Sequence, residues 1–379
     1  MLTYAALKLI WAVLLGVLLS MIGLMVGMDM GVGVLLRFVG RTDAERRVAI
    51  NAIGPHWDGN QVWFILGGGA VFAAFPNLYA TSFSVFYVVM ILLLFAMILR
   101  PFAFEYRSKA ESLRWRDNWD WMFLISGAVP MVVFGAAIGN ILEGVGFHFD
   151  WRGQYHQDET FLAYLLNPFA LFCGLTSLAL ALHQGGAMLA MRAAEPVAGR
   201  AARAAQWSGL IAAVLFVAGG FWVAAMPGFR LAAPVDPNGP ANPLAGAEVV
   251  RETGAWLANF HAYPALWAAP AIGLLGMLAG PLFLRARHPA LAWWSGALAW
   301  FGTLFTVGGA MFPFLMPSIT APAQSLTVWN AASSAYTLTW MSAFALVFTP
   351  AVLLYTQFAF RLMRGRLSPE QVSHDDHLY

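Results

Sequence analysis

Long apolar runs separated by short polar stretches repeat along almost the whole chain. The hydrocarbon core of a bilayer is about 30 Å thick, so a helix needs about 20 mostly apolar residues to cross it. Nine runs are long enough, at residues 8–37, 49–75, 78–100, 120–142, 160–191, 206–226, 260–284, 290–313 and 334–361. The pattern predicts an all-α integral membrane protein, a single polytopic domain over residues 1–379 with about nine transmembrane helices.

The composition agrees with a membrane location. Hydrophobic residues make up 60% of the chain and charged residues only 11%, against about 25% charged residues in soluble domains. The formal net charge of +2 is too small to indicate a nucleic-acid partner. The single cysteine, Cys173, lies in an apolar run, so we expect neither a disulfide framework nor a thiolate metal site within this chain.

The positions of Lys and Arg predict the orientation, because cytoplasmic loops are enriched in both. One alternating set of loops contains Arg41, Arg46, Arg47, Arg107, Lys109, Arg114, Arg116, Arg192, Arg200, Arg203, Arg285 and Arg287. The opposite set holds only Arg152, Arg230 and Arg251. We therefore expect the N-terminus on the periplasmic side and the C-terminus in the cytoplasm.

Residues 54–64, "GPHWDGNQVWF", place several polar side chains at the head of a predicted span. On a helix, His56, Asn60 and Trp63 share one face, and Asp58 and Gln61 lie on a neighbouring face. Two interpretations stay open. The segment either joins helices through a polar cluster or handles water and protons inside the membrane.

Three further charged positions lie in or at the ends of predicted spans, where a charge at mid-membrane costs about 2.5–3.5 kcal/mol. Asp29 lies in the glycine-rich segment "GMDMGVG", and Arg100 and Asp120 border one cytoplasmic loop. We expect these three to cluster near the cytoplasmic half, with an ordinary Arg100–Asp120 ion pair as the simplest form. Glu105 and Lys109 are four residues apart and would form a surface pair on a continued helix.

Several segments resemble subunit II of the cytochrome bd-type quinol oxidases. They are "GMDMGVGVLLRFVGR", "PHWDGNQVWFILGGGAVFAAFP", "RPFAFEYRSK", "NPFALFCGL", "AMFPFLMPS" and "SLTVWNAASSAYTL". The resemblance implies a terminal oxidase of the bacterial inner membrane, which oxidises quinol, reduces dioxygen to water and generates a proton gradient. The last segment has Asn330 where an acidic residue is expected, which weakens any charged role there.

The resemblance also implies partners and cofactors. High-spin heme b and heme d are expected in a separate subunit I, in keeping with the absence of any histidine pair at matching depth in this sequence. Ubiquinone is expected as the substrate and as a candidate structural ligand. Small single-helix accessory subunits and membrane lipids are further candidate partners.

Residue roles follow from depth and chemistry together with the resemblance. We expect a cytoplasmic proton path through Lys109, Glu105 and Asp58, with polar support from His56, Asn60, Gln61 and Trp63. Asp29, Arg100 and Asp120 are expected to be structural residues that stabilise the hemes of the complex. The alternatives are a secondary transporter or channel, which also has buried acidic residues, and a purely structural subunit.

Overall fold

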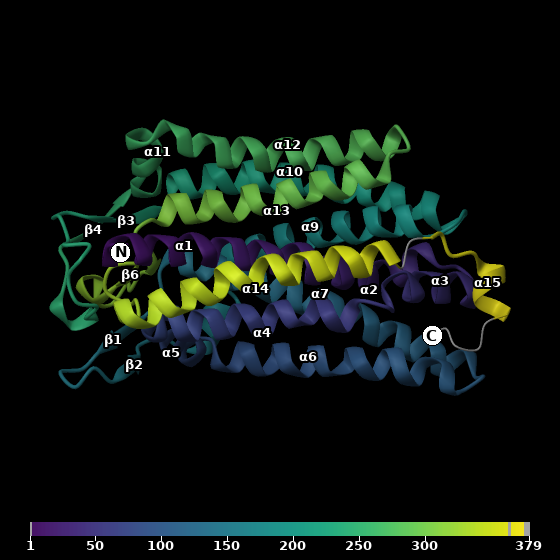
Figure 1. Ribbon diagram of the computed structural model, residues 1–379, viewed down its shortest axis with the longest axis horizontal. Helices are drawn as coiled ribbons and strands as arrows, with labels where there is room; N and C mark the ends of the chain where they lie inside the picture. Colours follow the sequence, from purple (N-terminus) through teal and green to yellow (C-terminus); the bar gives the residue numbers. More distant parts are fainter. Residues whose placement is uncertain (1, 363–364, 375–379) are drawn as a thin grey trace.

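The computed structural model describes residues 2–362 and 365–374. Long helices lie side by side along one common direction, and the short strands gather at the end that holds the N-terminus (Figure 1). Helices α3 and α15 lie at the opposite end.

The long helices are α1 (Tyr4–Met21) and α2 (Gly27–Val39), α4 (Trp57–Ala74), α6 (Tyr87–Tyr106), α7 (Leu113–Glu143), α9 (Pro168–Arg192), α10 (Val197–Ala225), α12 (Ala268–Arg285), α13 (Pro289–Met311) and α14 (Ala335–Leu362). Shorter helices are α3 (Asp43–Ile53), α5 (Pro76–Val85), α8 (Phe161–Leu165), α11 (Ala258–Ala262) and α15 (Pro369–His374). A π-helical turn, Ile22–Val26, joins α1 to α2 into one continuous span.

Three two-stranded antiparallel ladders complete the described part of the chain. They are β1 (Phe147–Phe149) with β2 (Tyr155–Gln157), β3 (Pro227–Leu231) with β4 (Val249–Thr253), and β5 (Phe314–Met316) with β6 (Leu326–Thr327). The connection between α10 and α12 therefore contains the β3–β4 hairpin. The prediction of an almost entirely helical membrane protein is confirmed.

Among the described residues, eight helices have the length and hydropathy needed to cross a membrane. Helix α4 has 18 residues and runs alongside them, in the place of the ninth expected span (Figure 1). Its predicted start at residue 49 is wrong, because residues 43–53 form the separate helix α3. Thr42 and Glu45 start α3 with a capping box, and the Gly54–Pro55 pair interrupts the helix before α4 begins.

Close packing of α2 against α7 and α9 explains the glycines around Asp29. A Cβ atom on Gly31 would overlap the main-chain carbonyl of Ala181 in α9. A Cβ atom on Gly127 in α7 would similarly overlap the main-chain carbonyl of Met30. Small residues at such contacts let transmembrane helices approach each other closely.

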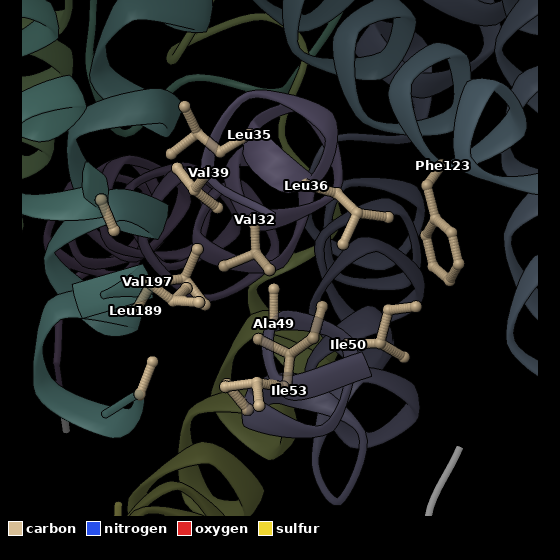
Figure 2. Packing of buried hydrophobic residues seen from close by; sticks show 14 of the residues in the cluster. Val32, Leu35, Leu36, Val39, Ala49, Ile50, Ile53, Phe123, Leu189 and Val197 are labelled. Atoms are coloured by element: carbon tan, nitrogen blue, oxygen red, sulfur yellow. The ribbon is translucent and has the colours of Figure 1, made fainter. Parts of the chain in front are cut away.

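An apolar cluster holds α3 against this tightly packed group (Figure 2). Val32 and Leu36 of α2 meet Ile50 and Ile53 of α3, and Phe123 of α7 lies beside them. The cluster fixes where α3 ends, and therefore where the polar first turn of α4 is placed.

Candidate functional site

Four buried polar side chains from three elements form an inner polar cluster: Asp29, His56, Asn60 and Arg100. The Asn60 side-chain amide donates to Asp29 Oδ2 at 2.9 Å, and His56 Nδ1 lies 3.8 Å from Asp29 Oδ1. Arg100 Nη2 donates to the main-chain carbonyl of Asp29 at 2.7 Å. All four side chains are less than a tenth exposed.

The structure thus brings Asp29 and Arg100 together, as expected, but through the main chain of Asp29. Arg100 Nη1 also donates to the sulfur of Met30, at 3.1 Å. The Arg100–Asp120 ion pair proposed from the sequence is wrong, since Asp120 bonds to other arginines. The expected three-residue cluster is split into two sites.

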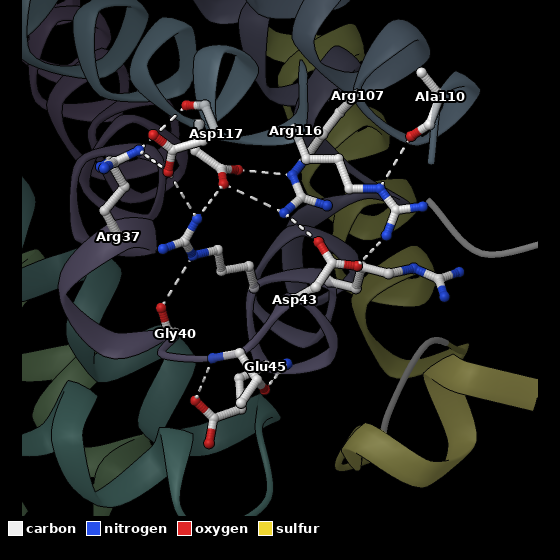
Figure 3. A network of polar contacts seen from close by, with 12 residues as sticks. Arg37, Gly40, Asp43, Glu45, Arg107, Ala110, Arg116 and Asp117 are labelled. Carbon is white, nitrogen blue, oxygen red and sulfur yellow. Dashed lines mark hydrogen bonds and ion pairs between the residues drawn. The ribbon is translucent and has the colours of Figure 1, made fainter. Parts of the chain in front are cut away.

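Asp120 belongs to an arginine network at the end of the molecule that holds α3. The network is made of Arg37, Arg46, Arg107 and Arg116 with Asp43, Asp117 and Asp120 (Figure 3). Asp120 is fully buried and accepts from Arg107 Nε at 2.6 Å and from Arg46 Nη1 at 2.7 Å. Arg107 also pairs with Asp43 at 2.8 Å. The network joins the start of α7 to α3 and to the end of α6.

Glu45 extends this polar layer to α10. Its carboxylate accepts from Arg200 at 2.7 Å and from the backbone N–H groups of Arg41 and Thr42. Burial alone would raise the pKa of Glu45, but these hydrogen bonds outweigh burial and hold the pKa below its ordinary value. Sequence reasoning missed Arg46, Arg107 and Glu45 as a set, although the capping-box pattern at 42–45 was a readable signal.

The two faces of α4 differ as the helical period predicts. Asn60, Trp63 and Gly67 are buried, whereas Asp58 is exposed and Gln61 is partly exposed. Asp58 lies in the first turn of α4 rather than two turns inside the span. The expectation that His56 and Asn60 lie beside Asp58 is wrong, because both face Asp29 instead.

Glu105 and Lys109 are also exposed. The Trp57 ring stacks on the Phe104 ring with centroids 4.5 Å apart, so the sequence neighbours Asp58 and Glu105 lie close to the same contact. The described residues contain no ion pair between Glu105 and Lys109. The regular α-helix ends at Tyr106 and residues 107–109 form a 3₁₀ turn, so the spacing of four no longer places the two side chains side by side.

A mostly apolar cavity of about 720 Å³ lies among α7, α9, α10, α12 and α13. Its apolar lining includes Phe134, Phe172 and Leu274. Ser177 and Trp300 also line it, and in the described structure Ser177 Oγ and Trp300 Nε1 have no hydrogen-bond partner although both residues are buried. No histidine or methionine lines this cavity, and Cys173 is the one lining residue of a type that ligates heme.

Within residues 2–362 and 365–374, no group of three or more His, Cys, Asp and Glu side chains is placed to hold a metal ion. His183 is buried in α9, and its Nδ1 bonds to the main-chain carbonyl of Ala205 at 2.8 Å. His56 is held in the inner polar cluster.

Comparison with known proteins decides the family. A model of the family described as cytochrome bd terminal oxidase subunit II matches residues 7–363. The chain belongs to this family. It is 44% identical over 378 residues to the cytochrome bd-I ubiquinol oxidase subunit 2 of Escherichia coli, covering 100% of this chain and 99% of the relative. It is 31% identical over 370 residues to the cytochrome bd ubiquinol oxidase subunit 2 of Bacillus subtilis, covering 97% and 98%.

A solved structure supports the fold of this cytochrome bd subunit. A chain of the bd oxidase from Geobacillus thermodenitrificans superposes with a TM-score of 0.68 and 14% sequence identity, covering 94% of this chain and 99% of that chain. The sequence-based resemblance to cytochrome bd subunit II is therefore confirmed.

Proposed function

We propose that this chain is the second subunit of a quinol oxidase that oxidises membrane quinol and reduces dioxygen to water. The observation that carries the proposal is the full-length similarity to ubiquinol oxidase subunits. The hemes belong to a partner, subunit I, and supply the oxygen chemistry there. The whole chain forms one membrane domain in the bacterial inner membrane, with its N-terminus periplasmic and its C-terminus cytoplasmic.

Subunit I docks on the face formed by α4, α6 and α14. Helix α14 is almost entirely exposed, since only 6% of its most apolar stretch is buried within this chain. Among the long helices it packs mainly against α1 and α4. The same face carries the exposed carboxylates of Asp58 and Glu105. A carboxylate that faces lipid is costly. The exposed face formed by α10 and α12 carries no charged residue in the helical segments 204–225 and 268–284. The charged face therefore suits a protein partner and the uncharged face suits lipid.

The proton path runs along this docking face rather than through the interior of the chain. Dioxygen reduction consumes protons, and membrane-embedded ionisable residues commonly form relays. Lys109 and Glu105 stand at the cytoplasmic end. Asp58 and Glu105 each follow one of the two stacked rings, Trp57 and Phe104, along the chain. Asp29, Arg100 and Asp120 keep a structural role, holding the helices that present this face and so stabilising the hemes of the complex.

The Asp58→Asn variant tests this path, since the amide keeps shape and hydrogen bonding but cannot carry a proton. We expect normal assembly and heme absorbance with much slower quinol-driven oxygen consumption. Glu111→Gln, an exposed carboxylate change at the same end of the chain, is the matched control and should leave turnover unchanged. Full turnover of Asp58→Asn with intact hemes would falsify the proton path, while lack of any heme-bearing partner would instead support a transporter or channel.

The cavity near Ser177 is a site for a structural quinone. Its volume lies within the usual range of about 300–1,000 Å³ for ligand pockets. Quinone carbonyl oxygens accept hydrogen bonds, and the Ser177 hydroxyl and Trp300 indole N–H are buried donors that lack partners. The apolar remainder of the lining suits an isoprenoid tail.

Quinone extracted from the purified complex should exceed the amount in complexes of a Ser177→Ala, Trp300→Phe double variant. Thr303→Val is the control, because Thr303 lines the same cavity but its hydroxyl already bonds to the Ala299 carbonyl at 2.8 Å. Retention of a phospholipid and no quinone would refute the quinone assignment without affecting the oxidase assignment.

A further inference from the structure

The β1–β2 hairpin projects beyond the ends of the long helices, next to α5 and α6 (Figure 1). At its tip, Trp151 is 80% exposed. The Arg152 guanidinium lies over the Trp151 ring, 4.5 Å from its centre. The hairpin tip lies beyond the start of α6, one of the helices that are long and apolar enough to cross a membrane (Figure 1). The Trp151 ring therefore lies outside the layer formed by these helices.

The turn that carries these two side chains is held rigidly. Asp150 Oδ1 accepts from the backbone N–H groups of Arg152 at 2.9 Å and Gln154 at 2.8 Å. Gly153 has a φ of 77°, a left-handed conformation that suits glycine. The exposed ring is thus presented by an ordered turn, and pre-organised side chains lose less entropy when a partner binds.

The base of the hairpin is anchored on both sides. The Gln324 side chain bonds to both the N–H and the C=O of Phe149, at 2.7 and 3.1 Å. Asp158 accepts from Thr320 at 2.6 Å and pairs with His148 at 2.9 Å. Phe147 and Phe149 belong to the same apolar cluster as Val89 of α6. The hairpin is therefore continuous with the helix that carries the proposed docking face.

Charge indicates the chemistry of the partner surface. Arg230 on the β3–β4 hairpin pairs with Glu252 at 2.9 Å. The Arg152 guanidinium has no ion pair with an acidic side chain among the described residues and lies over the Trp151 ring. Trp and Arg are the residues most enriched at the energetic centres of protein interfaces. A surface that covers this pair has to offer an apolar pocket and a carboxylate.

We propose that the β1–β2 hairpin is an extramembrane arm that docks against an acidic external loop of the heme-bearing subunit, with Trp151 and Arg152 as its anchors. This inference rests on the proposed function, because it takes subunit I as the occupant. It extends the subunit contact from the lipid-embedded helices to the aqueous side of the membrane.

A photo-reactive amino acid placed at position 151 of the full complex in native membranes tests the contact directly. We expect a crosslink to the heme-bearing subunit. The same probe at Tyr263, which is 65% exposed near α11 at the opposite edge, should give none. A lipid adduct, a crosslink to a second copy of this chain or no crosslink at position 151 would each overturn the inference.

Affinity provides the second measurement. Trp151→Ala should speed detergent-induced loss of subunit I by about 30-fold, or about 2 kcal/mol at 1.4 kcal/mol per factor of ten. Arg152→Ala should show a smaller acceleration, and Tyr263→Ala none. Equal dissociation rates for Trp151→Ala and Tyr263→Ala count against the arm. If a heme-bearing partner co-purifies but does not crosslink to position 151, this inference alone is refuted. If no heme-bearing partner co-purifies, the proposed function is refuted.

Discussion

Replacing Asp120 with Ala should strand two arginines inside the protein. Arg107 is 1% exposed and would keep only Asp43, and Arg46 would keep only Asp117 and the Gly40 carbonyl. Removing one partner of a buried ion pair typically costs about 3–5 kcal/mol. At 1.4 kcal/mol per factor of ten, this lowers the folding equilibrium roughly 150-fold to several thousand-fold.

Asp117→Ala is the matched control in the same network. Asp117 also bonds to two arginines, but its side chain is 43% exposed, so water replaces the lost contacts. Exposed pairs contribute about 0–1 kcal/mol. Both variants are compared with the parent in the assembled oxidase by denaturant titration in detergent, followed by heme absorbance. If Asp120→Ala unfolds at the same denaturant concentration as Asp117→Ala, burial does not control the strength of this network and the reasoning is wrong.

Two further predictions concern packing and pH. Gly31→Ala should prevent accumulation of the folded chain in membranes, because the added Cβ would overlap the Ala181 carbonyl. Gly308→Ala is the control and should accumulate normally, because a Cβ there meets no atom within 4 Å. Equal yields of the two variants would contradict the packing argument. In the β1–β2 hairpin, hydrogen bonds from His148 and Thr320 hold the pKa of Asp158 below its ordinary value. A depressed carboxyl pKa contributes stability that is present above the unfolded-state pKa and is lost as the pH falls through the folded-state pKa. The protection factors of the amides in residues 147–157, which correct for the pH dependence of intrinsic exchange, should therefore fall at acidic pH in the parent. Asp158→Asn should show low protection factors throughout, and a parent hairpin equally protected at acidic pH would exclude this contribution.

The sequence predicts the buried face of α4 well, since Asn60, Trp63 and Gly67 follow the helical period and that period survives in the folded chain. The sequence does not predict which arginines form ion pairs with Asp120. Arg46 is 74 positions away and Arg107 is 13 positions away, and the pairing depends on how α3 is placed against α7. The placement of α3 in turn depends on the interruption at Gly54–Pro55. The predicted span 49–75 passes through this point, although one helix ends and another begins there.

The strand ladders at the end that holds the N-terminus were not predicted, for a different reason. In "FHFDWRGQYHQ", Phe147, His148 and Phe149 alternate between buried and outward positions and a glycine follows in the turn, which is a readable hairpin pattern. Long apolar runs on both sides dominate the hydropathy profile and make the segment resemble a simple connection.

The π-helical turn at Ile22–Val26 sets how the second half of the first span is rotated about the helix axis relative to the first half. Each residue of an α-helix advances the chain by about 100° around its axis, so one residue more or fewer in this turn would rotate everything after it. The half before the turn holds Lys8, whose ammonium group bonds to three external main-chain carbonyls. The half after it holds Asp29 against Asn60 and Arg100. Each half of this helix is thus held in its own rotational position about the helix axis by its own contacts. A single-residue deletion between the halves would turn Asp29 away from its partners without changing any of the side chains involved.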